Sequence, residues 1–283
     1  MVEFTGEDRT SWLQGQVTQD VARLSVGEAA GFCICEPSGR LLSAGCLAVC
    51  EHRVVCLVPV ATVPAILGRV DEAVFIEDVS VRRPPAVQVW SLTGPGAGEH
   101  AEALASKTLA PAFPTAQAGV CYFAARSDDS EFENRLRSVA SPLAREAAEG
   151  LRLEAGIPRW GIDFDENTLA AEMGPHFVAQ AISYAKGCYT GQEVLMRIHS
   201  RGHTNRTWMG LVAESPIPPG AAVESRGAPC GRVTSTAPSR RLGFVAGAML
   251  RNDAAKPGEM VHVITSTATV RAEVRHMPLL LAG

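Results

Sequence analysis

The stretch Pro216–Leu250, PIPPGAAVESRGAPCGRVTSTAPSRRLGFVAGAML, consists of short apolar segments separated by turn residues. Turn signals recur at PIPPG, SRGAPCG and TAPSRR, and KPGE adds another at Lys256–Glu259. Proline presets the backbone of a turn and glycine tolerates positive φ, so each of these signals ends a strand. Short strands at this spacing are typical of a small antiparallel barrel. We therefore expect a C-terminal β-barrel domain over residues 207–283.

The composition limits the kind of protein. The chain has 283 residues, of which 46% are hydrophobic and 20% are charged. This is an ordinary globular balance, and the length suffices for two or three domains. The formal net charge is -4, whereas a domain that binds duplex nucleic acid is usually basic. The charge argues against general nucleic-acid binding and leaves a local basic patch open.

Neither a secretory signal nor a membrane span is predicted. Residues 1–20 carry acids and lack an apolar core, and the longest apolar stretch, Ala44–Leu67, is interrupted by charged residues. A bilayer span needs about 20 apolar residues. The eight cysteines are scattered, and Cys33 and Cys35 form only a CxC pair. We expect a cytoplasmic protein with reduced thiols.

Residues 50–139 resemble a separate insert in their pattern. The extended or strand candidates are VVCLVPV, SVRRPPAVQVWSLTG and GVCYFAA, and they are followed by the helix candidates ATVPAILGRVDEAVF, EHAEALA and DDSEFENRLRSVA, respectively. The order approximates βαββαβ, which predicts a ferredoxin-like domain.

The segment KGCYTGQE, Lys186–Glu193, carries the most specific chemistry. Gly187 and Gly191 permit positive φ or close backbone approach on both sides of Cys188. Lys186 could lower the pKa of the thiol if the two groups face each other. The segment is therefore either a tight loop that presents a thiolate or a buried turn with a small hydrophobic cysteine, and residue chemistry alone leaves both open.

Basic residues recur at every second position after this segment. EVLMRIHSRGH is predicted as a strand, in which Arg197, His199, Arg201 and His203 would line one face. Such a stripe suits an anion such as a carboxylate tail, a phosphate or RNA, or it is a solvated surface. A zinc site is not favoured, because no third ligand accompanies the two histidines.

The third segment is Leu151–Gly174, LRLEAGIPRWGIDFDENTLAAEMG. Glu154 lies at a helix end among Leu151, Leu153 and Ile157. A carboxylate there could accept paired N–H donors from a heterocycle such as a pterin, or it could form a salt bridge at the surface.

These motifs together resemble those of a known family. KGCYTGQE followed by RIHSRGHTNR is similar to the signature of the YgfZ family of folate-binding, iron–sulfur-cluster-associated proteins. Phe4–Ala44 resembles the family's opening block, and Gly227–Leu250 resembles its terminal barrel. The family belongs to the superfamily of the glycine-cleavage T-protein, an aminomethyltransferase that uses tetrahydrofolate. LRLEAGIPRWGID is similar to the T-protein's own segment.

The chain departs from T-proteins at one decisive place. T-proteins carry paired aspartates after the glycine turn of the opening block, and the corresponding positions here are Ser43 and Ala44. Neither residue can act as a base or stabilise a developing cation as a carboxylate would. The resemblance implies a folate pocket without T-protein chemistry, so whether the chain is an enzyme stays open.

The resemblance also implies the architecture. The expected fold class is α+β, a three-domain ring with a ferredoxin-like insert and a C-terminal antiparallel β-barrel. Residues 1–49 and 140–206 would form a discontinuous folate-binding domain, residues 50–139 the insert, and residues 207–283 the barrel.

The function implied by the resemblance is that of a tetrahydrofolate-binding accessory protein for assembly or repair of iron–sulfur proteins. The alternatives are a folate-dependent one-carbon transferase or demethylase and, with weaker support, an RNA-binding protein associated with tRNA modification. The expected cofactor is tetrahydrofolate or a one-carbon derivative, and the expected partners are iron–sulfur client or assembly proteins with a possible weak tRNA contact. No resident metal and no membrane contact are expected. The candidate site residues are Cys188 and Lys186 for the chemistry, and Glu154, Arg206, Tyr189, Gln192, Glu193 and Arg197 for the cofactor.

Overall fold

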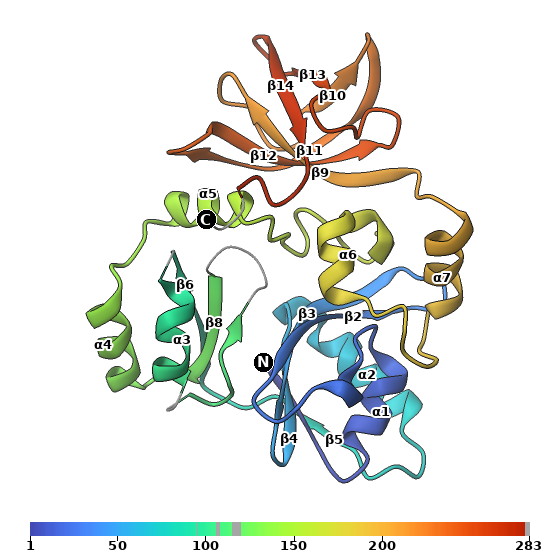
Figure 1. Ribbon diagram of the computed structural model, residues 1–283, viewed down its shortest axis with the longest axis vertical. Coiled ribbons are helices and arrows are strands. Elements are labelled where there is room, and N and C mark those ends of the chain that lie inside the picture. The colour runs from blue at the N-terminus through green and yellow to red at the C-terminus, as the bar shows by residue number, and fades with distance from the viewer. Residues whose placement is uncertain (95, 106–107, 115–119, 281–283) are drawn as a thin grey trace. The chain divides into compact units, whose positions relative to one another are not determined.

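A computed structural model describes residues 1–94, 96–105, 108–114 and 120–280 (Figure 1). The chain forms two compact units. The first contains Met1–Pro142 and Ala179–Met196, and the second contains Leu143–Val178 and, among the described residues, 197–280. None of the described helices is long and apolar enough to cross a membrane.

The first unit is built on a five-stranded antiparallel sheet. Its strand order is β2-β3-β4-β1-β5, and helices α1 and α2 contribute apolar side chains to its core. Phe4 of β1 stacks on Trp12 of α1 with ring centroids 5.9 Å apart, and both side chains are buried. The elements are β1 (Val2–Thr5), α1 (Arg9–Gln16), β2 (Ala29–Cys35), β3 (Leu41–Cys50), β4 (Arg53–Leu57), α2 (Val63–Ala73) and β5 (Ser80–Arg82), with short 3-10 turns at Val21–Arg23 and Val60–Thr62.

The pairing of β4 corrects the strand assignment made from the sequence. β4 was placed in the insert, but it pairs with β3 and with β1, and Cys50 lies opposite Arg53 across the hairpin. The predicted boundary at residue 50 therefore falls inside a hairpin. The segment VVCLVPV is apolar throughout, so its composition gives no information about which strand it would pair with. The three-domain division stays a prediction.

A smaller sheet follows in the same unit. Its strand order is β6-β8-β7, and helices α3 and α4 contribute to its apolar core. In this core the ring centroids of Phe123 and Phe132 lie 5.9 Å apart. The Asp129 carboxylate caps α4 by accepting the Phe132 N–H at 2.8 Å. The elements are β6 (Val87–Thr93), α3 (Ala97–Ala105), β7 (Phe113–Pro114), β8 (Val120–Arg126) and α4 (Ser130–Val139).

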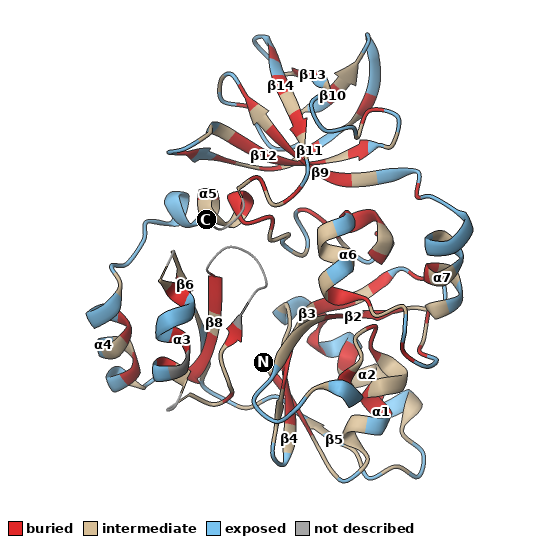
Figure 2. Cartoon of the chain, in the orientation of Figure 1, coloured by how far each residue is buried: buried red, intermediate tan, exposed pale blue. Residues whose placement is uncertain are grey.

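The second unit confirms the predicted barrel. Six antiparallel strands close in the order β10-β11-β12-β9-β14-β13, and helix α5 packs against β11. The interior is filled by buried aliphatic side chains such as Leu211, Val233 and Val261, and Figure 2 shows buried residues along these strands. Helices α6 (Pro175–Ala181) and α7 (Gln192–Arg201) each contain residues of both units. The other elements of the second unit are α5 (Arg145–Glu154), a 3-10 turn at Ala170–Met173, β9 (Arg206–Ala213), β10 (Ala222–Ser225), β11 (Ala228–Ser239), β12 (Gly243–Arg251), β13 (Met260–Ile264) and β14 (Thr269–Arg275).

Candidate functional site

Cys188 lies in the loop between α6 and α7, and its side chain is exposed. The other seven cysteines of the chain are buried or partly buried, and none forms a disulfide. Burial raises the pKa of Cys35 to about 12 and that of Cys46 to about 11, which keeps those thiols protonated. The loop therefore presents the most exposed thiol of the eight cysteines.

Helix α7 overturns the prediction of a strand after this loop. Val194, Leu195 and Ile198 lie at helical spacing, and Leu195 is buried. The alternation of basic residues suggested a strand, but the apolar spacing and the good helix formers in QEVLMR determine the structure. Arg197, His199, Arg201 and His203 consequently do not line one strand face. Arg197 and Arg201 share a helix face because they are four residues apart, and His203 lies beyond the helix.

Lys186 is buried and bonds to backbone carbonyls instead of extending toward solvent. Its ammonium donates to the carbonyl oxygens of Gln14 at 2.6 Å, Val17 at 2.7 Å and Gln19 at 2.8 Å. An ammonium has three N–H donors, so these bonds use all of them. Burial lowers the pKa of Lys186 to about 8, and the nearby Asp20 carboxylate opposes this shift.

This bonding makes Lys186 a cap on the end of α1. The last carbonyls of a helix have no partner inside the helix, and a cation there also interacts favourably with the helix dipole. Lys186 satisfies the carbonyl of Gln14, while the Thr190 N–H satisfies that of Gly15 at 3.2 Å. Activation of the Cys188 thiol by Lys186 was predicted only if the two groups face each other, and the observed bonds direct the ammonium to backbone carbonyls.

Further hydrogen bonds hold the chain before the thiol. Thr18 donates its hydroxyl to the Ala181 carbonyl at 2.6 Å, and the Ser183 N–H donates to the Thr18 carbonyl at 2.9 Å. The Gln192 amide lies 3.5 Å from the carbonyls of Lys186 and Gly187. Segment 181–192 is thus fastened to the end of α1 on both sides of Cys188.

The two glycines of the loop differ. Gly191 has φ of +85°, and a Cβ there would lie 2.7 Å from the Glu36 carbonyl oxygen and 2.9 Å from the Cys35 Cβ. Only glycine fits this position without strain. At Gly187 an added Cβ would meet nothing within 4 Å. Close approach is therefore required on the α7 side of the thiol only.

Tyr189, a candidate cofactor contact, turns inward. Its ring is buried, and the Lys186 ammonium lies 5.0 Å from the ring centroid. Burial raises the pKa of the phenol, and Cys35, Tyr184 and Cys33 act in the same direction. Within the described part of the chain the buried hydroxyl has no hydrogen-bond partner. Glu193 is exposed in the first turn of α7, where a carboxylate favours the helix dipole.

Glu154 ends α5 in the second unit, and its carboxylate is buried. Oε1 accepts the Ser239 hydroxyl and Oε2 accepts an Arg241 N–H at 2.6 Å. A carboxylate can accept about four hydrogen bonds, so each oxygen keeps capacity for another donor. The remaining acceptor positions can accept N–H donors from a second group. Ser239 and Arg241 lie 85 and 87 residues farther along the chain, and no local pattern in the sequence identified them.

Asp163 anchors the same segment to the barrel. Its Oδ1 accepts the hydroxyls of Thr234 at 2.6 Å and Ser235 at 2.5 Å. Its Oδ2 accepts an Arg152 N–H at 2.8 Å and the Arg159 backbone N–H at 2.9 Å. Four donors converge on one buried carboxylate, so GIPRWGID has a structural role that no pattern in the sequence indicated.

Arg206, the second expected folate contact, begins β9 and is partly exposed. Its guanidinium lies 3.0 Å from the Glu172 carboxylate and 3.4 Å from the Asn167 carbonyl. Arg206 thus has protein partners of its own, as Glu154 does. Arg197 is exposed on α7.

The positions that T-proteins fill with aspartates are buried in β3. The Ser43 hydroxyl lies 2.8 Å from that of Thr62, and Ala44 is buried beside it. No carboxylate is present at either position. Among the described residues, no group of three or more His, Cys, Asp or Glu side chains could hold a metal ion.

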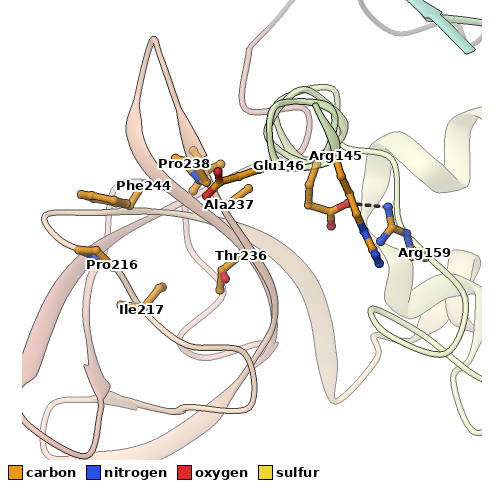
Figure 3. Close-up of a pocket in the computed structure, with 11 residues that line it drawn as sticks. Arg145, Glu146, Arg159, Pro216, Ile217, Thr236, Ala237, Pro238 and Phe244 are labelled. Atoms are coloured by element: carbon orange, nitrogen blue, oxygen red, sulfur yellow. Dashed lines mark hydrogen bonds and ion pairs between the residues drawn. The ribbon is translucent and has the colours of Figure 1, made fainter. Parts of the chain in front are cut away.

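A pocket of about 630 Å³ lies between α5, the segment that follows it and the barrel (Figure 3). Phe244 and Ile217 supply apolar surface, and Arg145 and Glu146 are charged residues at the pocket. Arg159 is held by an ion pair with Glu149, marked by the dashed line in Figure 3. None of the residues expected from the sequence to bind folate lines this pocket.

Comparison with known proteins supports the resemblance seen in the sequence. Residues 206–280 match the glycine cleavage T-protein C-terminal barrel domain. The crystal structure of the glycine cleavage system aminomethyltransferase T from Bartonella henselae matches 99% of this chain and 83% of its own, with a TM-score of 0.82 and 19% identity. This match shows the fold.

Sequence similarity to named proteins also supports this resemblance. The tRNA-modifying protein YgfZ of Yersinia enterocolitica is 28% identical over 76% of this chain and 69% of its own length. The same-named protein of Sodalis glossinidius is 26% identical over 78% of this chain and 71% of its own. A putative chloroplastic transferase of Arabidopsis thaliana is 22% identical over 98% of this chain and 69% of its own.

Proposed function

We propose that the chain is a member of the YgfZ family, to whose proteins it is similar, and that it is a tetrahydrofolate-binding accessory protein. In this proposal it supports iron–sulfur enzymes, among them enzymes that modify tRNA, through the thiol of Cys188. The link to tRNA in the names of its relatives would then be indirect, through the enzymes that the protein maintains.

The observation that carries the proposal is the exposure of Cys188 on a loop whose other specific residues are engaged in anchoring. Lys186 bonds to three carbonyls, Gly191 lies against the Glu36 backbone, and Gln192 lies at hydrogen-bond range of two carbonyls. None of these roles needs a cysteine at position 188, where the side chain is exposed. An accessible thiol on a fixed loop supports a chemical role for that side chain.

The proposed folate contacts are Glu154 and Arg206, by their positions in the family motifs. Glu154 supports this role because Ser239 and Arg241 fix a buried carboxylate that can accept further N–H donors. Folate would supply the one-carbon or redox chemistry of its pteridine ring. The protein's part would be to hold and orient that ring.

Aminomethyl transfer of the T-protein kind is not part of the proposal. That chemistry relies on a carboxylate in the opening block, and Ser43 is instead buried against Thr62 while Ala44 has no polar group. A serine hydroxyl paired with a threonine cannot stabilise a developing cation as a carboxylate does.

Complementation tests the role of the thiol. In cells that lack the native factor, we expect Cys188→Ser to fail to restore a tRNA modification made by an iron–sulfur enzyme. Cys50→Ser, a partly buried cysteine in β3, serves as the control and is expected to restore it. Both proteins must accumulate to the wild-type level. Full restoration by Cys188→Ser would disprove the role of the thiol.

A binding isotherm tests the folate site. We expect Glu154→Gln to weaken tetrahydrofolate binding about 10- to 100-fold, because a hydrogen bond to a charged group contributes about 1.5–3 kcal/mol. Glu146→Ala on the same helix is the control, since Glu146 is exposed. Unchanged affinity of the Glu154 variant would remove Glu154 from the site without affecting the thiol proposal.

A further inference from the structure

The loop between α2 and β5, whose flanking elements are labelled in Figure 1, contains two neighbouring apolar residues, Phe75 and Ile76. Phe75 is 84% exposed and Ile76 is 95% exposed, more than the other exposed large hydrophobic residues of the described chain. A single exposed hydrophobic residue is normal at a protein surface. Two adjacent hydrophobic residues that are both almost fully exposed need a physical explanation.

Local hydrogen bonds hold the loop in this conformation. The Glu77 carboxylate accepts the backbone N–H groups of Phe75 at 2.9 Å and Ile76 at 3.1 Å. These bonds lower the pKa of Glu77, so the carboxylate stays charged at neutral pH. Val74 and Val79 already pack against the core on the inner side of the loop. Phe75 and Ile76 are left on the outer side.

Contacts with the start of the chain fix the loop from its other end. The Asp78 N–H donates to the Asp8 carboxylate at 2.9 Å, and the Glu7 N–H donates to the Asp78 carboxylate at 2.9 Å. Gly6 has φ of +100°, and a Cβ there would lie 2.0 Å from the Asp78 carbonyl oxygen. The base of the loop is held as well, because the Trp12 indole N–H donates to the Ala73 carbonyl at 3.1 Å. The two side chains are therefore presented by a fixed backbone.

The surroundings of the two side chains are acidic. Residues 71–78 contain four carboxylates and no Lys, Arg or His. Glu7 and Asp8, which bond to the loop, add two more. The nearby Arg9 is engaged with the carbonyls of Gly6 and Glu51. We call the carboxylates of residues 71–78 and of Glu7 and Asp8 the acidic collar. The collar would repel an anionic membrane or a nucleic acid, whereas it would attract a protein with cationic side chains.

We propose that Phe75 and Ile76 form a docking knob for a partner protein whose surface offers an apolar pocket bordered by Lys and Arg. An aromatic side chain buries about 150–250 Å², whereas a standard interface buries about 800 Å² on each partner. The two residues are thus the central anchor of a larger contact, and the carboxylates of the collar form its polar rim. This surface is separate from the Cys188 loop and does not depend on the proposed function.

Site-specific photo-crosslinking in cells, followed by binding measurements, tests the proposal. The full-length chain carries p-benzoylphenylalanine at position 75 or, as the control, at Val60, which is 66% exposed in the same unit. We expect a product specific to position 75, with the crosslink in an apolar pocket bordered by Lys or Arg. A product that also forms from position 60, a crosslink to a second copy of the chain, or no product would overturn the proposal.

Binding of the partner identified in this way is then measured with purified proteins. We expect Phe75→Ala/Ile76→Ala to weaken binding at least about 100-fold, because truncation of central anchors removes most of the affinity. Asp71→Lys/Glu72→Lys should slow association and reverse its salt dependence. The thermal unfolding midpoint should not fall in either variant, because the altered side chains are exposed. Unchanged affinity of the alanine variant, or binding of the wild-type chain to anionic vesicles instead, would refute the knob.

Discussion

The Cys188 loop and the segment Leu151–Asp163 are both glycine-containing, charge-bearing motifs, but they are anchored in opposite ways. In the first, one cation bonds to backbone carbonyls of α1. In the second, the carboxylates of Glu154 and Asp163 collect side-chain donors from the barrel. Both anchoring groups are buried, but the Lys186 anchor leaves the side chain of the nearby Cys188 exposed. A charged residue in a motif can therefore hold the motif in place without taking part in its chemistry.

The largest effect is expected where the carboxylate anchor is removed. Asp163→Ala leaves the donors of Thr234, Ser235 and Arg152 without their acceptor. Breaking a buried ion pair by removing one partner costs about 3–5 kcal/mol, so we expect the free energy of unfolding to fall by that amount. Chemical denaturation measures it.

Asp253→Ala provides the matched control. Asp253 lies 2.8 Å from Arg251, the same distance as between Asp163 and Arg152, but on the surface. An exposed pair contributes about 0–1 kcal/mol. Equal destabilisation by the two substitutions would mean that burial does not make the Asp163–Arg152 pair more important for stability than the exposed Asp253–Arg251 pair.

The cationic anchor should contribute less, with a distinctive pH dependence. Lys186→Met leaves three carbonyls without their donor, and we expect a loss of about 2–3 kcal/mol in the free energy of unfolding at pH 7. The pKa of Lys186 falls from 10.5 in an ordinary environment to about 8 in the fold. Between these values the unfolded chain binds more protons, so this residue's contribution to stability rises with pH.

The measurement is the difference in unfolding free energy between the wild-type chain and Lys186→Met, followed from pH 7 to pH 10. Above pH 8 the unfolding free energy of the wild type should rise relative to that of Lys186→Met, because only the wild type carries the titrating group. A constant difference would contradict the lowered pKa. Lys186→Arg keeps the positive charge and is therefore the control for the loss of charge in Lys186→Met.

The sequence predicted what depends on neighbouring residues. The barrel was predicted because each turn signal, such as PIPPG or KPGE, acts on its own few residues. α7 was assigned wrongly because Arg197, His199 and Arg201 alternate as in a strand, while burial follows the helical spacing of its apolar residues. The exposure of Cys188 was one of two alternatives, and the structure decides between them.

The anchors could not be predicted for a different reason. Lys186 bonds to carbonyls 167 to 172 residues away, and every residue type carries a carbonyl, so no residue type marks the acceptor. Ser239 and Thr234 are ordinary strand residues, and only the closed barrel brings them to Glu154 and Asp163. Tertiary pairing of this kind leaves no local periodicity.

A smaller effect should separate the two glycines of the loop. Gly191→Ala must place a Cβ against the Glu36 carbonyl at positive φ, and left-handed backbone costs an alanine about 1–2 kcal/mol. Gly187→Ala meets open space, and we expect a change within about 0.5 kcal/mol. Thermal unfolding of both variants makes the comparison. Equal stability would place the loop away from Glu36.

The smallest effect on stability is expected at Cys188, where reactivity gives the sharper test. Native-state alkylation at pH 8 should label Cys188 first, because Cys33 and Cys35 are buried and burial raises the pKa of both thiols. Cys188→Ser should remove this fast phase and change the free energy of unfolding by less than about 0.5 kcal/mol. Lys186→Met then separates anchoring from activation. Since the ammonium bonds to carbonyls, its loss should leave the labelling rate unchanged or raise it by loosening the loop. A rate reduced about 10-fold, with the chain still folded, would mean that Lys186 activates the thiol and that its anchoring role is secondary.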